Sequence, residues 1–423
     1  MWGLYRIGIR LYGWSLQLAA LFHPKARSWA AGRRGWGAQH RQLLADSSGE
    51  GPLLWIHCAS LGEFEQGRPV MEGLKREAPY IRILLTFYSP SGYEIRRNYA
   101  EADYVAYLPL DSVSNARDFL EIWQPELAVF VKYEFWFNYL RGLQQNGIPT
   151  VLIAGLFRPG QVFFRPYGKP FLQVLAGFDH LFLQNQASAK HLRQHGIEHF
   201  TVAGDTRIDR VCQIAEAAPG FPLVAQFKQN APVFIVGSSW PEDEAHLLPF
   251  INDQLPAGWK AIIAPHQIDE EHLRNIEKGL QLPSCRYSEA TARGLPDDCR
   301  VLLIDNIGML SALYQYGKIA YIGGGFGADI HNTLEPIAFG LPVLFGPKYE
   351  KFEEARYLAD NGGGFVVEDC RSLAEAFRNL QAEEAYENAS RTALAYLHKN
   401  KGASEQAVRY LRGKLDAASS PKP

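Results

Sequence analysis

The feature that most constrains this chain is an alternation of short apolar runs with stretches of helical period, which begins after Gly51. Hydrophobicity is continuous within each run, as in parallel strands that are buried on both faces. The stretches between the runs supply the crossover helices that parallel strands need. The strands expected in the first half are residues 53–60, 81–87, 105–110, 127–131, 150–156, 180–184 and 200–203.

The alternation stops at residues 217–222, which contain two prolines and a glycine, and then starts again. The chain's 423 residues also exceed what one hydrophobic core usually supports. We therefore predict an α/β fold of two Rossmann-like doubly wound domains that face each other across a cleft. The second-half strands expected are residues 233–238, 261–264, 301–304, 319–322, 342–345 and 365–367. The expected divisions are an attachment segment at 1–22, domains at 23–215 and 216–416, and a frayed tail at 417–423.

The first 45 residues contain seven basic residues and no acidic one, although the whole chain has a net charge of −2. That near-neutral total provides no overall basic field that would attract nucleic acid. The uncharged run 11–22 is too short to cross a bilayer, which takes about 20 apolar residues. Because aromatic residues and arginines accompany it, we expect a helix that lies in the headgroup region of an anionic membrane. A core helix and a signal peptide are the alternatives.

Two carboxylates follow expected strands in the first half. Ser60 and Glu63 have the spacing of a capping box, in which Ser60 accepts from the Glu63 amide. A general base at the mouth of a cleft would occupy the same position, because ligands bind at the carboxyl ends of parallel strands. Glu134 falls in the first turn of an expected helix, where it either caps that helix or belongs to a site.

Residues 322–336 combine a strand end, a glycine-rich loop that contains Gly324, and a helix that we expect to begin at Asn332. The free amides of such a helix can receive a phosphate. The match to a dinucleotide fingerprint is weak because no acidic residue ends the next strand, and no Gly-Lys-Ser/Thr of a P-loop follows. Asn332 and Glu335 have the spacing of a cap pair, and Glu335 is equally suited to accept from the two hydroxyls of a ribose.

Three further groups of residues follow strands of the second half and should meet at the same edge of the sheet. Each alone is an ordinary turn or cap, and it is their convergence that indicates a nucleotide site. They are Ser238, the pair Pro265 and His266, and the pair Gly308 and Met309.

The order and spacing of several short motifs resemble those of the Kdo (3-deoxy-D-manno-octulosonic acid) transferases of lipopolysaccharide synthesis. The resemblance covers nearly the whole chain and implies inverting glycosyltransferases of the GT-B architecture, acting at the cytoplasmic face of the inner membrane. The motifs are Ser60-Leu-Gly-Glu63, Glu134-Phe-Trp136, Gly204-Asp-Thr-Arg-Ile-Asp209, Gly308-Met309 and His331-Asn-Thr-Leu-Glu335-Pro.

The resemblance implies that Glu63 is the base that deprotonates a sugar hydroxyl of a lipid A precursor, while CMP leaves from CMP-Kdo. It implies no cofactor and no metal, and it leaves the oligomeric state open. Family members often have Pro-Arg-His where this chain has Pro265 and His266. Ser60, Glu134, Arg158 and Arg207 are candidates for contacts to the acceptor, to the Kdo carboxylate or to phosphate. The implied donor site comprises Ser238, Pro265, His266, Gly308, Met309, Gly324, Asn332 and Glu335.

Two other functions are compatible with the sequence. One is a different GT-B enzyme, such as a UDP-sugar transferase or a nucleotide-sugar epimerase, which uridine rather than cytidine nucleotides would stabilise against heat. The other is a membrane-associated nucleotide-binding protein without catalytic activity, for which Glu63→Gln would change no measurable output.

Overall fold

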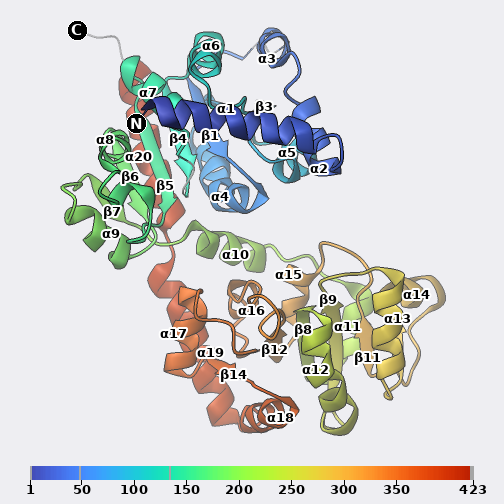
Figure 1. Ribbon diagram of the computed structural model, residues 1–423. Coiled ribbons are helices and arrows are strands. Elements are labelled where there is room, and N and C mark those ends of the chain that lie inside the picture. Colours follow the sequence, from blue (N-terminus) through green and yellow to red (C-terminus); the bar gives the residue numbers. More distant parts are fainter. Residues whose placement is uncertain (1, 47–48, 133–134, 420–423) are drawn as a thin grey trace. The chain divides into compact units, whose positions relative to one another are not determined.

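The computed structural model describes residues 2–46, 49–132 and 135–419. The chain forms two compact units (Figure 1). The N-terminal unit comprises Met1–Arg210 together with Asn400–Pro423, and the C-terminal unit comprises Val211–Lys399. Each unit is an α/β layer structure around its own parallel sheet, which confirms the predicted fold class.

The sheet of the N-terminal unit has seven parallel strands in the order β3-β2-β1-β4-β5-β6-β7. The strands that form its centre are buried along their whole length, as their continuous hydrophobicity predicts. The strands are β1 (Leu53–Cys58), β2 (Arg82–Phe87), β3 (Tyr104–Tyr107), β4 (Leu127–Val131), β5 (Thr150–Gly155), β6 (His180–Leu183) and β7 (Phe200–Val202).

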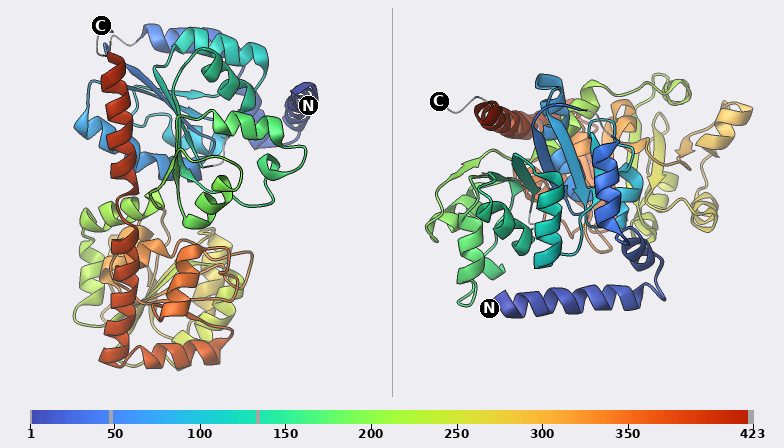
Figure 2. Two further views of the ribbon diagram at one scale, coloured as in Figure 1. Left: turned by 90° about the vertical axis from the view of Figure 1, so that its left-hand side faces the viewer. Right: turned by 90° about the horizontal axis from the view of Figure 1, so that it is seen from above.

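Helices cover both faces of this sheet (Figures 1 and 2). Successive strand residues point to opposite faces, so that Trp55 belongs to one apolar core and Ile56 to the other. The helices are α1 (Trp2–Ala19), α2 (Pro24–Ala31), α3 (Trp36–Ala45), α4 (Leu61–Glu77), α5 (Pro90–Arg96), α6 (Val113–Trp123), α7 (Phe137–Gln145), η1 (Val162–Phe164), α8 (Lys169–Ala176), α9 (Gln186–Arg193), α10 (Thr206–Glu216), which runs into the C-terminal unit, and α20 (Ala403–Ser419).

The last helix, α20, belongs to the N-terminal unit, whereas the sequence placed residues up to 416 in the C-terminal domain. Apolar residues of α20, such as Val408 and Leu411, pack in the same core as Met71 of α4. The Asp209 carboxylate also accepts hydrogen bonds from the backbone N–H of Gly402 (2.6 Å) and Ser404 (2.7 Å), which fixes the start of the helix. The expected tail from residue 417 is helical through Ser419, and residues 420–423 lie outside the described part.

Helix α1 lies along the outside of the N-terminal unit (Figure 2). One of its faces is packed: Trp2 and Tyr5 make ring contacts with Phe137, at centroid distances of 6.0 and 5.3 Å, and Gly13 is buried. A Cβ at Gly13 would lie 2.6 Å from Leu110 Cδ2, so glycine permits the close approach. Within the described residues, no helix is both long and apolar enough to cross a membrane.

The C-terminal unit contains a second seven-stranded parallel sheet, in the order β10-β11-β9-β8-β12-β13-β14. Its strands are β8 (Val233–Ser239), β9 (Lys260–Pro265), β10 (Ser284–Arg286), β11 (Val301–Leu303), β12 (Ile319–Ile322), β13 (Val343–Phe345) and β14 (Gly364–Val366). Its helices are α11 (Pro222–Lys228), α12 (Pro241–Asp253), α13 (Glu270–Gly279), α14 (Tyr287–Arg293), α15 (Leu310–Leu313), η2 (Tyr314–Tyr316), α16 (Leu334–Ile337), α17 (Glu353–Asn361), α18 (Cys370–Asn379) and α19 (Glu383–Asn400).

All the strands expected from the sequence are present, with bounds that differ by at most a few residues. The sequence did not predict β10, which is short, largely polar and at the edge of its sheet. An edge strand pairs on one side only, so it needs no continuous apolar run.

Candidate functional site

Glu63 lies in the first turn of α4, directly after the central strand β1, and its side chain is half-buried. The hydroxyl of Ser60, the N-cap residue of this helix, donates to Glu63 Oε2. Ser60 makes no side-chain bond to a backbone amide, so the capping box expected from the spacing is not formed. The carboxylate is instead held at the carboxyl end of β1 by a hydroxyl, with one oxygen engaged in that bond.

The neighbouring strand β4 ends at Val131, and Lys132 then adopts a left-handed backbone (φ +68°). A lysine in this conformation is strained, and such strain is typical of functional turns. Positive charge on Lys132 helps to lower the pKa of Asp205. The predicted site residue Glu134 lies outside the described residues.

Trp136 is fixed beside these strand ends by a buried hydrogen-bond chain. Its indole N–H donates to His57 Nε2 (2.8 Å), and its ring stacks on Tyr88 at 4.3 Å between centroids. His57 Nδ1 lies 2.9 Å from Thr86 Oγ1, which also accepts from the indole N–H of Trp55 (2.8 Å). Complete burial lowers the pKa of His57 to about 3, so the imidazole is neutral and carries its hydrogen on Nδ1.

Of the two predicted arginines, Arg158 follows β5 and is exposed, and Arg207 lies in the first turn of α10. Arg207 forms an ion pair with Asp205 (2.7 Å). Burial opposes ionisation of Asp205, but the Arg207 guanidinium lowers its pKa below the ordinary value. The hydroxyl of Thr206 donates to the carbonyl of Gln66 (2.7 Å), one turn along α4 from Glu63. This contact brings the start of α10 to the helix that carries Glu63.

A buried carboxylate, Asp111, links α1 to the segment that follows Trp136. It accepts from the Tyr5 hydroxyl (2.5 Å) and from the backbone N–H of Asn138 and Tyr139 (both 3.1 Å), which lie in the first turn of α7. Anions are favoured at a helix N-terminus. Burial nevertheless dominates and raises the pKa of Asp111 to about 6.

In the C-terminal unit, the predicted residues follow four strands that are adjacent in the sheet, β11, β9, β8 and β12. Ser238 lies within β8 in a left-handed conformation (φ +54°), where the register to β9 shifts. Pro265 ends β9, and Gly308 (φ +92°) precedes the buried Met309 after β11. The structure therefore brings these residues to one edge of the sheet, as the sequence predicted.

The glycine-rich loop after β12 is held close to β8 and to the first turn of α12. Gly324 has a φ of +93°, and a Cβ there would lie 2.3 Å from the Asp329 carbonyl oxygen. Its backbone N–H donates to Asp243 Oδ2 (2.7 Å), which also accepts from the Trp240 N–H (2.9 Å). A Cβ at Gly323 would lie 2.1 Å from the Ser238 carbonyl oxygen, so only glycine fits there.

The exposed ring of His266 stacks over two other rings, those of Trp240 and His331, which lie side by side and nearly coplanar, with centroids 6.4 Å apart and an interplanar angle of 5°. The His266 centroid lies 4.5 Å from that of Trp240 and 4.5 Å from that of His331, with interplanar angles of 22° and 21°. The Trp240 indole N–H donates to His331 Nε2 (2.9 Å). Burial, and then the neighbouring His266, lower the pKa of His331, which favours its neutral form. The stack lies between the end of β9 and the residues that follow the glycine loop.

Asn332 and Glu335 are in direct contact: Asn332 Nδ2 donates to Glu335 Oε1 (3.0 Å), while Asn332 Oδ1 accepts from the Leu334 N–H (3.2 Å). The expected helix therefore begins at Leu334, two residues later than predicted, and has only four residues. Burial, and then the negative charge of Glu335, raise the pKa of Tyr314, whose hydroxyl occupies the space beside Gly237 of β8. Among the described residues, no three His, Cys, Asp or Glu side chains are grouped as metal ligands would be.

Sequence reasoning did not identify Lys132, His57, Trp240 or the pairing of His331 with Trp240. Lys132 and Trp240 each follow a buried strand, which is the signal that could have selected them. His57 lies inside an apolar run and differs from its neighbours only by its ring nitrogens, so its link to Trp136 becomes visible only in three dimensions.

Comparison with known proteins gives one consistent result. The family described as 3-deoxy-D-manno-octulosonic-acid transferase (kdotransferase) matches residues 31–210. A 3-deoxy-D-manno-octulosonic acid transferase of Aquifex aeolicus is 28% identical over 333 residues, which cover 77% of this chain and 85% of the relative. The enzyme of the same name from Chlamydia pneumoniae is 26% identical over 355 residues, 80% of each chain.

Among solved structures, UDP-GlcNAc 2-epimerase from Neisseria meningitidis, bound to UDP-GlcNAc, superposes with a TM-score of 0.62 and 16% identity. The match covers 86% of this chain and 100% of the epimerase. At this identity the likeness concerns the fold alone, an arrangement of two doubly wound units of the GT-B type.

Proposed function

Because residues 31–210 match the Kdo transferase family and the relatives named above are Kdo transferases, we propose that this chain is a glycosyltransferase that transfers Kdo from CMP-Kdo to a sugar hydroxyl of a lipid A precursor and releases CMP. The observation that carries the proposal is the half-buried carboxylate of Glu63 at the carboxyl end of β1, held by the Ser60 hydroxyl. Ligand sites of doubly wound sheets lie at this end of the strands.

In the proposed reaction Glu63 accepts the proton of the acceptor hydroxyl as its oxygen attacks the anomeric carbon of Kdo, and the bond from that carbon to the CMP phosphate breaks. A single base suffices for inversion, since no covalent intermediate has to form and be broken. The Ser60 hydroxyl fixes Oε2, so that Oε1 is available to the substrate. Ser60 is thus a positioning residue, and Ser60→Ala should lower turnover several-fold while leaving CMP binding unchanged.

For the donor, we assign the nucleotide to the edge formed by β11, β9, β8 and β12. Glu335, oriented by Asn332, is placed to accept from ribose hydroxyls, and the backbone of the glycine loop allows close approach of the phosphate. His266 is exposed at the end of β9, next to the position where family members often have an arginine that this chain lacks. Glu335→Ala and Asn332→Ala should weaken CMP binding without changing the fold.

We further propose that α1 attaches the enzyme to the cytoplasmic face of the inner membrane. Large apolar side chains are exposed along its outer face at helical spacing, among them Leu4 (73%), Leu11 (55%), Trp14 (68%) and Leu18 (64%). Isolated exposed leucines are ordinary, but a continuous stripe on one helix marks an interaction surface. An acylated, phosphorylated acceptor resides at such a membrane surface.

The attachment is tested by replacing Leu4, Leu11 and Leu18 with glutamine, which spares Trp2 and Tyr5 on the packed face. Binding to phosphatidylglycerol-containing vesicles should fall at least ~100-fold, because the variant no longer transfers three leucine side chains from water into the bilayer. The control is Ile95→Gln with Leu394→Gln, two exposed apolar residues elsewhere (58% and 36% exposed). Equal partition of the two variants would refute the role of α1.

Transfer itself is tested by mass spectrometry of the product formed from CMP-Kdo and a tetraacylated lipid A precursor. The proposal expects the mass of at least one Kdo residue on the acceptor and equimolar release of CMP. If UDP-sugars are consumed and CMP-Kdo is not, the proposal fails in favour of another nucleotide-sugar enzyme of the same fold.

A further inference from the structure

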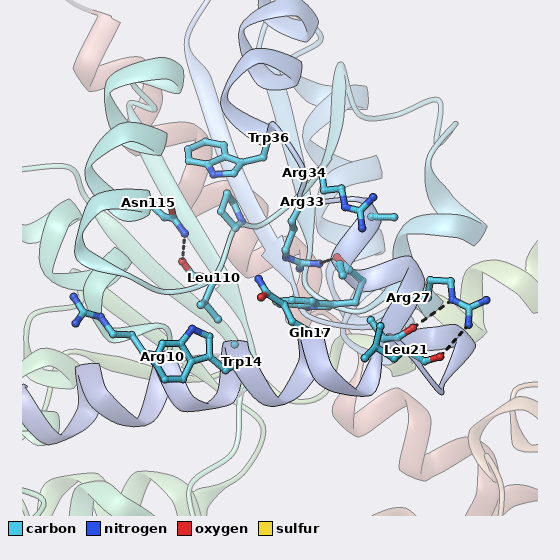
Figure 3. A pocket seen from close by; sticks show the side chains of 16 residues that line it. Arg10, Trp14, Gln17, Leu21, Arg27, Arg33, Arg34, Trp36, Leu110 and Asn115 are labelled. Atoms are coloured by element: carbon cyan, nitrogen blue, oxygen red, sulfur yellow. Dashed lines mark hydrogen bonds between the residues drawn. The ribbon is translucent and has the colours of Figure 1, made fainter.

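Two features outside the residues around Glu63 and the donor edge are candidates for a further site. One is a cavity of about 1050 Å³ between α1, α2 and the segment that follows β3 (Figure 3). Its exposed arginines, Arg10 and Arg34, lie at opposite ends with Trp14 and Gln17 between them (Figure 3), so the two guanidinium groups do not form one site. The other feature is a pair of thiols in the C-terminal unit that lie in direct contact.

The two thiols are those of Cys285 and Cys299, both free cysteines, whose sulfur atoms lie 2.8 Å apart. The S–H of Cys299 donates to the carbonyl oxygen of Val301 (3.4 Å), so Cys285 is the donor in the contact between the two sulfurs. The sulfurs of a disulfide are about 2.05 Å apart, so a small movement would bring this pair to bonding distance.

The backbone holds the two cysteines together independently of their side chains. Cys285 is the middle residue of the edge strand β10, and Cys299 lies just before the neighbouring strand β11. The backbone N–H groups of Arg300 and Val301 both donate to the carbonyl oxygen of Pro283, at 2.8 and 3.1 Å. The contact between the thiols is therefore a consequence of strand pairing and does not need a rare side-chain encounter.

The two thiols differ in their access to solvent. Cys285 is half-buried, whereas Cys299 is buried and only 2% exposed. Oxidation of cysteine depends on exposure, and cysteines that respond to oxidants are often accessible and placed next to a second, resolving cysteine. Cys285 matches the accessible thiol of such a pair, and Cys299 matches the resolving thiol.

The segment between the two cysteines carries α14 and reaches toward the donor edge of the sheet. Ser288, in the first turn of α14, donates its backbone N–H to Asp305 Oδ1 (3.0 Å) and its hydroxyl to Asp305 Oδ2. Asp305 lies between β11 and the predicted donor residues Gly308 and Met309. A bond between the two cysteines would thus fasten both ends of a segment that contacts the start of this loop.

We propose that Cys285 and Cys299 form a reversible redox site, at which a peroxide converts the two thiols into a disulfide that fastens β10 and α14 to β11. The inference is independent of glycosyl transfer. Disulfides of reducing compartments are usually transient and often sense oxidants, which agrees with a pair that is reduced in the resting protein.

The reaction has two steps. In the first, one peroxide oxygen is transferred to Cys285 Sγ, which gives a sulfenic acid and one water. In the second, Cys299 Sγ attacks Cys285 Sγ, the S–O bond breaks, and the hydroxyl leaves with the hydrogen of Cys299 as a second water. The two thiols lose two electrons and two protons, which the peroxide accepts. A dithiol reductant returns the pair to thiols by exchange.

The test is peptide mapping of the purified full chain after treatment with hydrogen peroxide, alkylation of the remaining thiols and digestion with trypsin without reductant. Cleavage after Arg286 and Arg293 places the two cysteines on separate peptides, residues 279–286 and 294–300. The expected product is these two peptides joined by one disulfide, which dithiothreitol separates. Oxidation of Cys285 to a sulfinic acid beside an alkylated Cys299 would overturn the proposal, as would a disulfide from Cys285 to any other cysteine.

Serine variants locate the reaction. Cys285→Ser and Cys299→Ser should each abolish the joined peptides. The matched control is Cys370→Ser, which removes a half-buried cysteine of the same unit whose sulfur accepts from Gln254 Nε2 (3.6 Å) instead of contacting a thiol. This variant should form the product as wild type does, and its failure to do so would refute the assignment to Cys285 and Cys299. The mapping of wild type needs no variant, so a folding defect in a serine variant leaves it decisive.

The fastening itself is measured by hydrogen exchange of oxidised and reduced wild type. Backbone amides of β10 and α14 should exchange at least ~10-fold more slowly after oxidation, because the disulfide closes a short loop around α14. Peroxide-treated Cys285→Ser should keep the exchange rates of the reduced protein. Equal rates in oxidised and reduced wild type would show that the disulfide does not fasten these elements and would contradict that part of the proposal.

Discussion

Asp111 gives the sharpest stability prediction, because one buried carboxylate joins α1, through Tyr5, to the first turn of α7. The perturbation is Asp111→Asn, which keeps the size and an oxygen acceptor but removes the titratable group. Burial raises the pKa of Asp111 in the folded protein from 3.8 to about 6. In the unfolded chain the Asp111 carboxyl is in water, so its pKa should lie near the ordinary value.

The sign follows from the two pKa values. Between about pH 4 and pH 6 the folded protein still holds the proton that the unfolded chain has lost, so the free energy of unfolding falls as pH rises through this window. A difference of about two pKa units corresponds to roughly 3 kcal/mol. Below the window the stabilisation is complete, and above it the penalty for an ionised buried carboxylate is constant. The asparagine variant lacks this contribution.

Urea unfolding at a series of pH values, followed by tryptophan fluorescence, measures the difference in the free energy of unfolding between wild type and Asp111→Asn. Only Trp240 and Trp259 of the nine tryptophans lie in the C-terminal unit, so the signal reports mainly on the N-terminal unit. The stability of wild type relative to Asp111→Asn should fall by about 3 kcal/mol between pH 4 and pH 6.5. A difference that stays constant to within about 1 kcal/mol across this range would show that Asp111 does not titrate with a raised pKa in the folded protein.

Two further variants test individual contacts. Trp136→Phe should destabilise the N-terminal unit by about 1–3 kcal/mol in urea unfolding, because it leaves the buried Nε2 of His57 without a donor; unchanged stability would contradict that hydrogen bond. Gly324→Ala should lower CMP affinity in calorimetry, because a Cβ at this position would lie 2.3 Å from the Asp329 carbonyl oxygen. The control is Gly327→Ala, since a Cβ at Gly327 would lie 3.6 Å from its nearest neighbour, an ordinary contact distance. Equal effects of the two alanine substitutions would count against this account of the loop.

The architecture was largely predictable from the sequence because strands buried on both faces must be continuously apolar. That rule located every strand except β10, whose one-sided pairing makes no such demand. It did not reveal that α20 returns to the N-terminal unit, since an amphipathic helix does not specify which sheet its apolar face will cover.

The sequence also predicted which site residues lie near one another, because the topology brings the carboxyl ends of adjacent strands together. The contacts within the site were not. The Ser60–Glu63 spacing fits a capping box, yet the hydroxyl bonds the carboxylate instead. The stack of His266 on Trp240 and His331 joins residues that are distant in sequence, and no periodicity records such a contact.

The proposed role of Glu63 as the base in Kdo transfer is tested by the single-turnover rate of Glu63→Gln with CMP-Kdo and the lipid A precursor. We expect unchanged CMP affinity and a rate at least ~100-fold below wild type, the usual scale for loss of a general base. The matched control is Glu65→Gln, on the same turn of α4, where Glu65 forms an ion pair with Arg96 (3.0 Å) instead of contacting Ser60. Its rate should stay close to wild type, and a Glu63→Gln rate equal to that of this control would contradict the mechanism.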